Sequence, residues 1–340
     1  MKIWIDILTP KQLLFSEHII RKLSKNHEIL CTSRSYNEVS KLSQIRKFDL
    51  ILVGKHGGGK KSDKLDAHID RMKKLSPIIT KFSPDLVISF CSPEAARISF
   101  GLSIKHVAFC DSPHAEAVMR LTLPLIQKLL IPWIIPKKEF VKYGIRSENI
   151  IPYKAIDASI TIKRKSTKDK NQFYKKSSKK RILIRMEEEQ AAYSSKSTKI
   201  IPIIKKIIDD FSEENIIILG RYPEQIKKLK RIFGKRVQIL KMSYDGKFLL
   251  ENIDVFIGSG GTMTAESALL GVPTISYNAV PNIVENYLVK NYLVKRESDP
   301  KKIVTIIKKY MKSSDDGIKK RAQRISSQME DPVQKLFKII

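Results

Sequence analysis

The stretch DVFIGSGGTMTAESALLGVPTISY, residues 254–277, decides the fold class of this chain. Its first apolar run predicts a buried strand, residues 262–270 predict a helix, and the final PTISY predicts a second strand. Gly271 and Pro273 are placed to end the helix, because glycine accepts a left-handed conformation and proline cannot continue a helix. Strand, helix and strand in this order are typical of a parallel sheet covered by helices.

The same alternation runs along both halves of the chain. Predicted strands lie at 2–8, 28–33, 49–54, 85–90, 105–110, 180–186, 215–220, 236–241, 253–258 and 273–277, with helical segments such as 10–26 and 68–82 between them. We therefore predict an α/β protein with two doubly wound, Rossmann-like parallel-sheet domains, 1–155 and 181–340. The basic segment 156–180 is predicted to link them, and the last helices are candidates to pack back on the first domain. Open parallel sheets bind ligands beyond the carboxyl ends of their strands, so we expect a ligand cleft between the domains.

The net charge of the chain limits the kinds of partner that we expect. Its 340 residues carry 64 Lys and Arg against 35 Asp and Glu, a formal net charge of +29, which attracts anions such as acidic lipids, nucleic acids or phosphorylated substrates. A solvated basic surface is the alternative. The lysines are spread along the chain, so no specific nucleic-acid partner is expected. The apolar stretch 121–135 is short and interrupted by Pro124, Gln127, Lys128 and Pro132, which predicts a cytoplasmic protein, at most peripheral to the inner face of an anionic membrane.

The turn Ser259-Gly260-Gly261 is the first candidate site. Glycines let a backbone approach a ligand closely, and the first amides of a helix point outward from the positive end of its dipole, so a phosphate fits there. Glu266 follows about one helical turn later, where its carboxylate could accept hydrogen bonds from ribose hydroxyls. Together these features predict binding of a nucleoside diphosphate. The alternative is a tight turn followed by an acid that the helix dipole favours.

The same residues resemble a known signature. Ser259-Gly260-Gly261, Glu266 and Gly271-Val-Pro273 look like the nucleotide-sugar motif of GT-B-fold enzymes. It is similar to that of the non-hydrolysing UDP-N-acetylglucosamine (UDP-GlcNAc) 2-epimerases and of the glycosyltransferase that makes the lipid-linked peptidoglycan precursor. The resemblance implies that Glu266 holds the ribose and that Ser259, Gly260, Gly261 and Thr262 hold the phosphates.

A narrower resemblance spans most of the chain. MKIWIDILTPKQLLF at 1–15, GKHGG at 54–58, DSPHAEAVMRLTLPL at 111–125 and the GSGGTMTAESALLGVP segment resemble the archaeal domain-of-unknown-function 354 family, which is GT-B-like. Relatives often carry histidines in the first loop, where this chain has TPKQ at 9–12.

Candidates for the chemistry lie in the first domain. Asp111 and His114 follow a predicted strand end, where they are placed for general acid–base catalysis; a helix cap with an incidental histidine is the alternative. His56 lies in a glycine-rich loop that takes an anion or an acceptor sugar, or is simply flexible. Lys11 begins the helix 10–26, where its charge opposes the helix dipole, so an anionic ligand there would offset that cost.

Two arginines complete the candidate set in the second domain. Arg185 and Arg221 each follow a predicted strand and suit a phosphate or a base edge; a surface position is the alternative. The sequence has no Asp-x-Asp, HExxH or ligand-spaced Cys/His cluster, so neither a metal nor another cofactor is expected. Helix amides and arginines would instead neutralise a leaving diphosphate.

These observations predict a metal-independent, GT-B-type glycosyltransferase. It would transfer a sugar from a nucleotide-diphosphate sugar to an unknown sugar or lipid-linked acceptor. A UDP-GlcNAc 2-epimerase-like isomerase is the first alternative, and a non-catalytic basic binder of nucleic acid or anionic membrane is the second.

Overall fold

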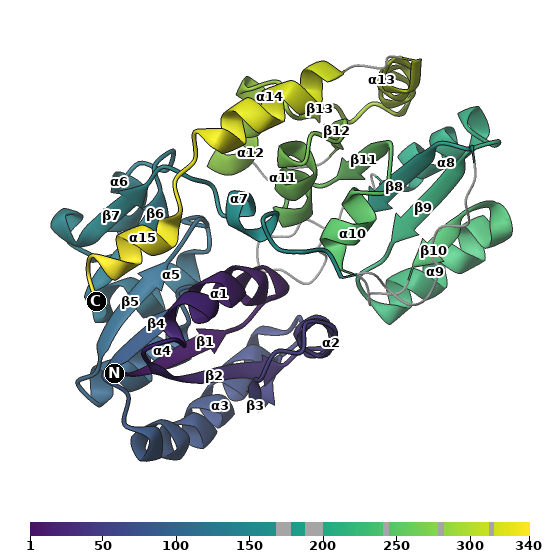
Figure 1. The fold of residues 1–340 in the computed structure, drawn as a ribbon. Coiled ribbons are helices and arrows are strands. Elements are labelled where there is room, and N and C mark those ends of the chain that lie inside the picture. Colours follow the sequence, from purple (N-terminus) through teal and green to yellow (C-terminus); the bar gives the residue numbers. More distant parts are fainter. Residues whose placement is uncertain (168–177, 188–199, 241–244, 278–281, 313–315) are drawn as a thin grey trace. The chain divides into compact units, whose positions relative to one another are not determined.

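The computed structural model describes residues 1–167, 178–187, 200–240, 245–277, 282–312 and 316–340 (Figure 1). The chain divides into two compact units. Unit 1 comprises Met1–Arg164 together with Met329–Ile340, and unit 2 comprises Lys165–Gln328. Each unit contains one parallel sheet with helices packed against it, which confirms the predicted α/β class.

Unit 1 has a seven-stranded sheet in the order β3-β2-β1-β4-β5-β6-β7. Its strands are β1 (Lys2–Ile7), β2 (Glu28–Ser35), β3 (Ile51–Lys55), β4 (Leu86–Ser89), β5 (Lys105–Phe109), β6 (Lys128–Pro132) and β7 (Ile150–Tyr153). Its helices are α1 (Pro10–Leu23), α2 (Asn37–Ile45), α3 (Lys61–Phe82), α4 (Pro93–Gly101), α5 (Glu116–Thr122), α6 (Lys138–Val141), α7 (Ala158–Thr161) and α15 (Pro332–Phe337).

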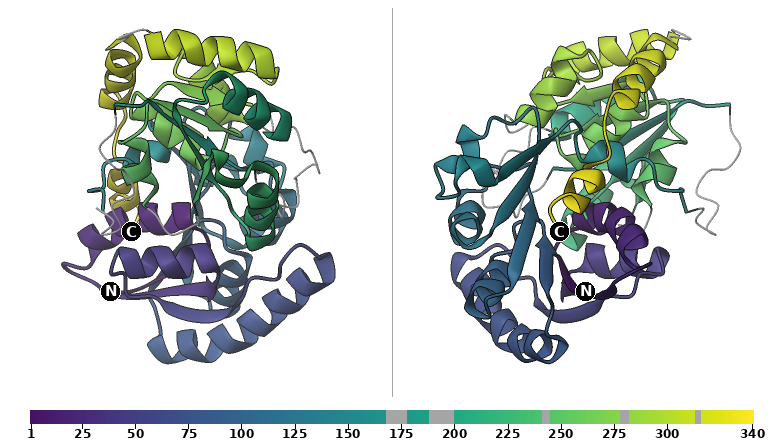
Figure 2. Two further views of the ribbon diagram at one scale, coloured as in Figure 1. Left: turned by 90° about the vertical axis from the view of Figure 1, so that its right-hand side faces the viewer. Right: turned by 60° about the vertical axis from the view of Figure 1, so that its left-hand side comes forward.

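The core of unit 1 explains why its central strands are apolar throughout. Helices cover both faces of a parallel sheet, so side chains on both sides of each central strand are buried. The 22-residue helix α3 lies along the sheet (Figure 2). Its Leu75 and Ile79 belong to one buried hydrophobic cluster with Trp4 and Val87 of the sheet. The strand order reverses between β1 and β4, and the loops that leave these two strands diverge there, which is where open sheets of this kind form a ligand crevice.

The C-terminal helix α15 belongs to unit 1, where it packs beside β6 and β7 (Figure 1). Asp331 caps it by accepting a hydrogen bond from the Val333 amide at 3.0 Å. The other carboxylate oxygen of Asp331 binds Lys22 Nζ at 2.6 Å and His18 Nε2 at 2.9 Å, both on α1. These contacts tie the end of the chain to the first helix.

Unit 2 has a six-stranded sheet in the order β10-β9-β8-β11-β12-β13. Its strands are β8 (Arg181–Arg185), β9 (Asn215–Leu219), β10 (Gln238–Leu240), β11 (Val255–Gly258), β12 (Thr274–Ser276) and β13 (Lys295–Arg296). Its helices are α8 (Ile200–Asp210), α9 (Pro223–Phe233), α10 (Gly246–Leu250), α11 (Thr262–Leu269), α12 (Ile283–Lys290), α13 (Pro300–Lys312) and α14 (Asp316–Ser327). Here the strand order reverses between β8 and β11.

Three strands and one boundary differ from the sequence prediction. The strands β6, β7 and β13 were not predicted, and each is short or lies beside prolines. Residues 156–164 belong to unit 1 and are not part of a linker, because Ile156, Ala158 and Ile160 are buried in its core. Most of the remaining predicted linker, 168–177, lies outside the described residues.

Candidate functional site

A buried lysine joins two aspartates at the carboxyl edge of the unit 1 sheet. Lys11 Nζ lies 2.6 Å from Asp111 Oδ2 and 2.7 Å from Asp157 Oδ2. Asp111 follows β5, and Asp157 follows β7 and is 3% exposed. Tyr153, the last residue of β7, donates its hydroxyl to Asp157 Oδ1 at 2.5 Å. Three segments of the chain that are distant in sequence therefore form one cluster around Lys11.

The local sequence fixes Lys11 at the start of α1. Thr9 caps the helix by accepting a hydrogen bond from the Gln12 amide, Pro10 occupies the first helical position, and the Gln12 side chain accepts from the Leu8 amide at 2.6 Å. A cation in the first turn opposes the helix dipole. The sequence suggested that an anionic ligand offsets this cost; the structure shows the chain's own carboxylates, Asp111 and Asp157, in that position.

The cluster shifts the pKa values of its two aspartates in opposite directions. Burial alone would raise the pKa of Asp111, but the charge and hydrogen bond of Lys11, with a hydrogen bond from Ser112, outweigh it and hold that pKa below its usual range. Burial, together with the charge of Asp111, raises the pKa of Asp157 against the pull of Lys11. Two carboxyl groups whose pKa values are pushed apart are the arrangement that supplies a base and an acid in one site.

His114 lies beside this cluster, as the sequence predicted from its spacing to Asp111. Its side chain is exposed, and partial burial with the charge of Lys11 lowers its pKa, although Asp111 opposes that shift. His56 lies elsewhere. It follows β3, and β2, β1 and β4 separate that strand from β5. The His56 ring stacks on Tyr36 with centroids 4.9 Å apart, and its Nδ1 accepts a hydrogen bond from the Gly58 amide at 3.1 Å.

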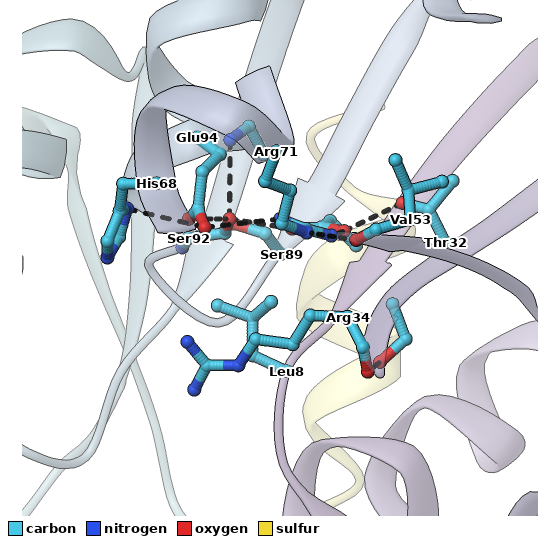
Figure 3. Close-up of polar contacts among 12 residues, drawn as sticks. Leu8, Thr32, Arg34, Val53, His68, Arg71, Ser89, Ser92 and Glu94 are labelled. Atoms are coloured by element: carbon cyan, nitrogen blue, oxygen red, sulfur yellow. Dashed lines mark hydrogen bonds and ion pairs between the residues drawn. The ribbon is translucent and has the colours of Figure 1, made fainter. Parts of the chain in front are cut away.

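A second buried network occupies the point where the strand order of unit 1 reverses (Figure 3). Arg71 of α3 is fully buried and donates to Asp6 through Nη2 at 2.6 Å and Nη1 at 3.1 Å, while its Nε donates to the Val53 carbonyl at 3.1 Å. Thr32 and Ser92 donate to the same carboxylate at 2.7 and 2.6 Å. Asp6 therefore accepts four hydrogen bonds, and the network is saturated on its acidic side.

Glu94 extends this network toward the surface. Its Oε1 lies 3.5 Å from Arg71 Nη1 and 3.3 Å from Nδ1 of the partly exposed His68 (Figure 3). The sequence analysis missed Arg71, although a signal was present. Arg71, Leu75 and Ile79 are spaced at four-residue intervals, which places the arginine on the same buried face of α3 as the two apolar residues.

In unit 2, the predicted glycine turn lies at the corresponding reversal, between β8 and β11. Gly260 has φ +82°, which favours glycine, and a Cβ on Gly258 would stand 2.6 Å from the Phe256 ring. Among the residues that the structure describes, no atom lies within 4 Å of the position that a Cβ on Gly261 would take. Asn282 steadies the turn by donating its side-chain amide to the Gly260 carbonyl at 3.4 Å.

The helix α11 that follows the turn begins at Thr262, which is exposed, and carries Glu266 on its buried face. Glu266 is 4% exposed. Its Oε2 lies 3.8 Å from the position of a Cβ on Gly246, the first residue of α10. Glu266 therefore lies beside the start of α10.

Arg185 and Arg221 follow the neighbouring strands β8 and β9. Arg185 Nη1 donates to the Gly220 carbonyl at 3.0 Å, and Arg221 Nε donates to the Met186 carbonyl at 3.3 Å. Both guanidinium groups therefore lie at the carboxyl edge of the unit 2 sheet, Arg185 on the strand next to β11 and Arg221 one strand further away. The structure brings the predicted residues of unit 2 to one edge of one sheet.

Neither a metal-binding cluster nor a membrane-spanning helix is found in the described ranges. Within them, no group of three or more His, Cys, Asp and Glu side chains is arranged to hold a metal ion. Every helix in those ranges is too short or too polar to cross a membrane.

Comparison with solved structures defines the class of fold. UDP-GlcNAc 2-epimerase from Neisseria meningitidis, solved with UDP-GlcNAc bound, superposes with a TM-score of 0.73 over 99% of this chain and 98% of that one, at 15% identity. The spinosyn rhamnosyltransferase SpnG, solved with thymidine diphosphate, gives a TM-score of 0.64 over 99% of both chains at 11% identity. The chain therefore has the two-domain fold of GT-B-like proteins.

The family follows from sequence comparison. The chain belongs to the DUF354 family, described as "Protein of unknown function", whose model matches residues 1–340. The uncharacterized protein MJ0665 of Methanocaldococcus jannaschii is 30% identical over 346 residues, which cover 99% of this chain and 97% of that protein. The predicted family resemblance is confirmed.

Proposed function

We propose that this protein is an enzyme that binds a nucleotide-diphosphate sugar in unit 2 and transfers its sugar to an acceptor. The observation that carries the proposal is the position of the Ser259–Gly261 turn and Glu266 at the strand reversal of unit 2. Strand reversals are where open α/β sheets bind ligands. The GT-B-like structures that resemble this chain include proteins solved with UDP-GlcNAc and with thymidine diphosphate.

In this proposal the turn holds the diphosphate. The open backbone at Gly261 and the first amides of α11 suit a phosphate, which also gains from the positive end of the helix dipole. Arg185 and Arg221 follow β8 and β9 and add positive charge at the same edge. Glu266 accepts hydrogen bonds from the ribose, which enters beside Gly246.

Unit 1 supplies the acid–base chemistry. Asp111, kept ionised by Lys11, acts as the base that takes a proton from the acceptor hydroxyl, and His114 lies next to it. We further propose that no metal takes part, since helix amides and arginines neutralise the leaving diphosphate.

Nucleotide affinity tests the donor site. UDP, GDP, ADP, CDP and dTDP and their sugars are screened by thermal shift, since a ligand that binds only the native state raises its stability, by about 2.7 kcal/mol at 100 times its Kd. Calorimetry then compares Glu266→Gln with Glu213→Gln, a change at an exposed glutamate of the same unit. A hydrogen bond to a charged group contributes about 1.5–3 kcal/mol, so Glu266→Gln should weaken binding about 10- to 100-fold.

Equal affinity in both variants would exclude Glu266 from the nucleotide site. Binding that survives Glu266→Gln and falls steeply with salt would instead favour a basic surface that attracts anions without a specific site.

One observation favours an epimerase as the alternative. Asp111 and Asp157 form a pair with separated proton affinities in one cluster, and sugar epimerisation requires both an acid and a base. Incubation with UDP-GlcNAc alone separates the two functions. An epimerised sugar nucleotide formed without an acceptor indicates the epimerase, whereas turnover that requires an added acceptor indicates the transferase.

A further inference from the structure

Within the part of the chain that the structure describes, the Arg34 side chain differs from those of Lys11, Arg46 and Arg71 of unit 1 in having no hydrogen-bond or ion-pair partner. It lies near the carboxyl end of β2 and is half-buried. Its Nε is buried and lacks a hydrogen-bond acceptor, and throughout the described residues its guanidinium takes part in no hydrogen bond or ion pair. Figure 3 shows its side chain next to the Asp6–Arg71–Glu94 network without a dashed contact.

The nearby carboxylates are already committed to Arg71. Asp6 accepts four hydrogen bonds, and Glu94 Oε1 is shared between Arg71 and His68. Burial lowers the pKa of Arg34, and the charges of Glu94 and Asp6 compensate only in part. An arginine whose role is structural is expected to be paired, as Arg71 is, because leaving a buried donor unsatisfied costs stability.

The surroundings of Arg34 are those of a binding surface. Tyr36 follows on the same strand end and stacks on His56 of the next loop, which offers a flat aromatic face. Behind His56 the loop continues through Gly57–Gly59. Gly58 has φ +66°, and no atom of the described part of the chain lies within 4 Å of a Cβ placed on Gly58 or Gly59, so those residues leave the backbone there uncovered. A guanidinium, an aromatic face and an open glycine loop suit a sugar that carries an anionic group.

We propose that Arg34 binds an anionic group, a phosphate or a carboxylate, of the acceptor at the carboxyl ends of β2 and β3. The identification of this ligand as the acceptor rests on the proposed function; the anion site itself does not. Because β1 and β4 lie between β2 and β5, an acceptor that reaches both residues spans three strand spacings of about 4.8 Å each. Asp111 activates the hydroxyl of this molecule, and Arg34 fixes its distant charged end. The acceptor class is then a phosphorylated or acidic sugar.

The test follows the arginine Nε–H signals of the full-length protein by NMR with ¹⁵N-labelled arginine. The Arg34 signal is identified by its loss in Arg34→Lys. Arg46 is the matched control, because it is buried in the same unit and paired with Glu17 through Nε at 3.0 Å and Nη2 at 2.6 Å. Inorganic phosphate and glucuronate are titrated separately, with UDP present throughout to occupy a nucleotide site in unit 2.

We expect the Arg34 signal to shift to saturation with one of the two probes while the Arg46 signal stays in place. Saturation with phosphate indicates a phosphorylated ligand, and saturation with glucuronate an acidic sugar. An Arg34 signal that moves with neither probe overturns the proposal, whatever UDP does.

Thermal unfolding gives a second, independent readout. Arg34→Met should leave Tm unchanged or raise it, because it removes a buried charge for which no described residue is a partner. Arg46→Met should lower Tm, because among the described residues Glu17 then keeps only its contact with the largely exposed Arg21. If Arg34→Met lowers Tm as much as Arg46→Met, then Arg34 is structural and the proposal is wrong.

Discussion

Replacing Arg71 with methionine tests whether the Asp6 network holds unit 1 together. The change keeps most of the side-chain volume but removes both hydrogen bonds from the guanidinium to Asp6, which is 1% exposed. Removing one partner of a buried ion pair costs about 3–5 kcal/mol, because the other charge remains in the interior. Thr32 and Ser92 still donate to Asp6, so we expect a loss of about 3 kcal/mol, at the lower end of this range.

Tryptophan fluorescence during urea unfolding measures this loss of stability in unit 1. The chain has two tryptophans, Trp4 and Trp133, and both lie in unit 1. Trp4 is fully buried and donates its indole N–H to Thr32 at 2.8 Å, so it reports directly on the network around Asp6.

A double variant and a pH series identify the cause. Asp6→Asn with Arg71→Met removes the stranded charge and should be more stable than Arg71→Met alone. In the native chain burial would raise the pKa of Asp6, but Arg71, Ser92 and Thr32 outweigh it, so the pKa lies below its usual value. The stabilisation from Asp6 is then present above about pH 4 and is lost as pH falls through the lowered pKa.

Without Arg71, burial should raise the pKa of Asp6 above its usual value, so Arg71→Met should lose less stability on acidification than the parent, and the gap between the two should narrow. A loss below about 1 kcal/mol at pH 7, or a double variant no more stable than Arg71→Met, would refute the reasoning.

Three further changes test other parts of the fold. Burial lowers the pKa of His106 to about 3, so between that value and about 6.5 the unfolded chain binds a proton that the native ring does not. The free energy of unfolding should therefore fall by up to about 1.4 kcal/mol per pH unit as pH drops through this range. Urea unfolding of His106→Gln should lack this slope. Gly271→Ala should destabilise unit 2 by about 1–3 kcal/mol, measured by circular dichroism, because φ is +77° and the new Cβ would stand 2.8 Å from the Lys319 Cα. Asp331→Asn keeps a helix cap but loses its ion pairs, so hydrogen exchange in α15 should accelerate while that in β1 stays unchanged.

The sequence predicted the fold well because the fold rests on local patterns. Apolar runs separated by helical periods gave ten of the strands, and the Gly271-Val-Pro273 punctuation correctly ended α11. The strand β6 escaped notice because its apolar residues run on into prolines, which also suggested a surface segment. The position of 156–164 depends on burial against distant residues, which no local pattern reports.

The sites were predictable only in part, for a similar reason. Strand ends could be read from the sequence, so Asp111, Arg185, Arg221 and the Ser259–Gly261 turn were expected at sheet edges, and the structure places them there. Asp157 was missed because it comes to Lys11 through the return of the chain after β7, a contact across 146 residues between Lys11 and Asp157 in the sequence.

The two acidic clusters of unit 1 differ in how accessible their carboxylates are. That difference suits the Asp6 cluster to a structural role and the Asp111 cluster to substrate binding. Asp6 accepts hydrogen bonds from three side chains, is fully buried and cannot exchange a proton without losing the contacts that join β1 to β2, α3 and the start of α4. Asp111 and Asp157 share Lys11 and each accept one further side-chain hydrogen bond, from Ser112 and Tyr153 respectively, and Asp111 remains 20% exposed. A substrate hydroxyl that approaches Asp111 can therefore gain a hydrogen bond without dismantling the core. Lys11 holds the pKa of Asp111 below its usual range, whereas burial and the charge of Asp111 raise the pKa of Asp157, so the two carboxyl groups differ in the direction of their shifts. By this reasoning Lys11 is a positioning residue that lowers the pKa of Asp111. Lys11→Met should therefore raise the apparent pKa in the pH–rate profile, while the Kd for the nucleotide changes little.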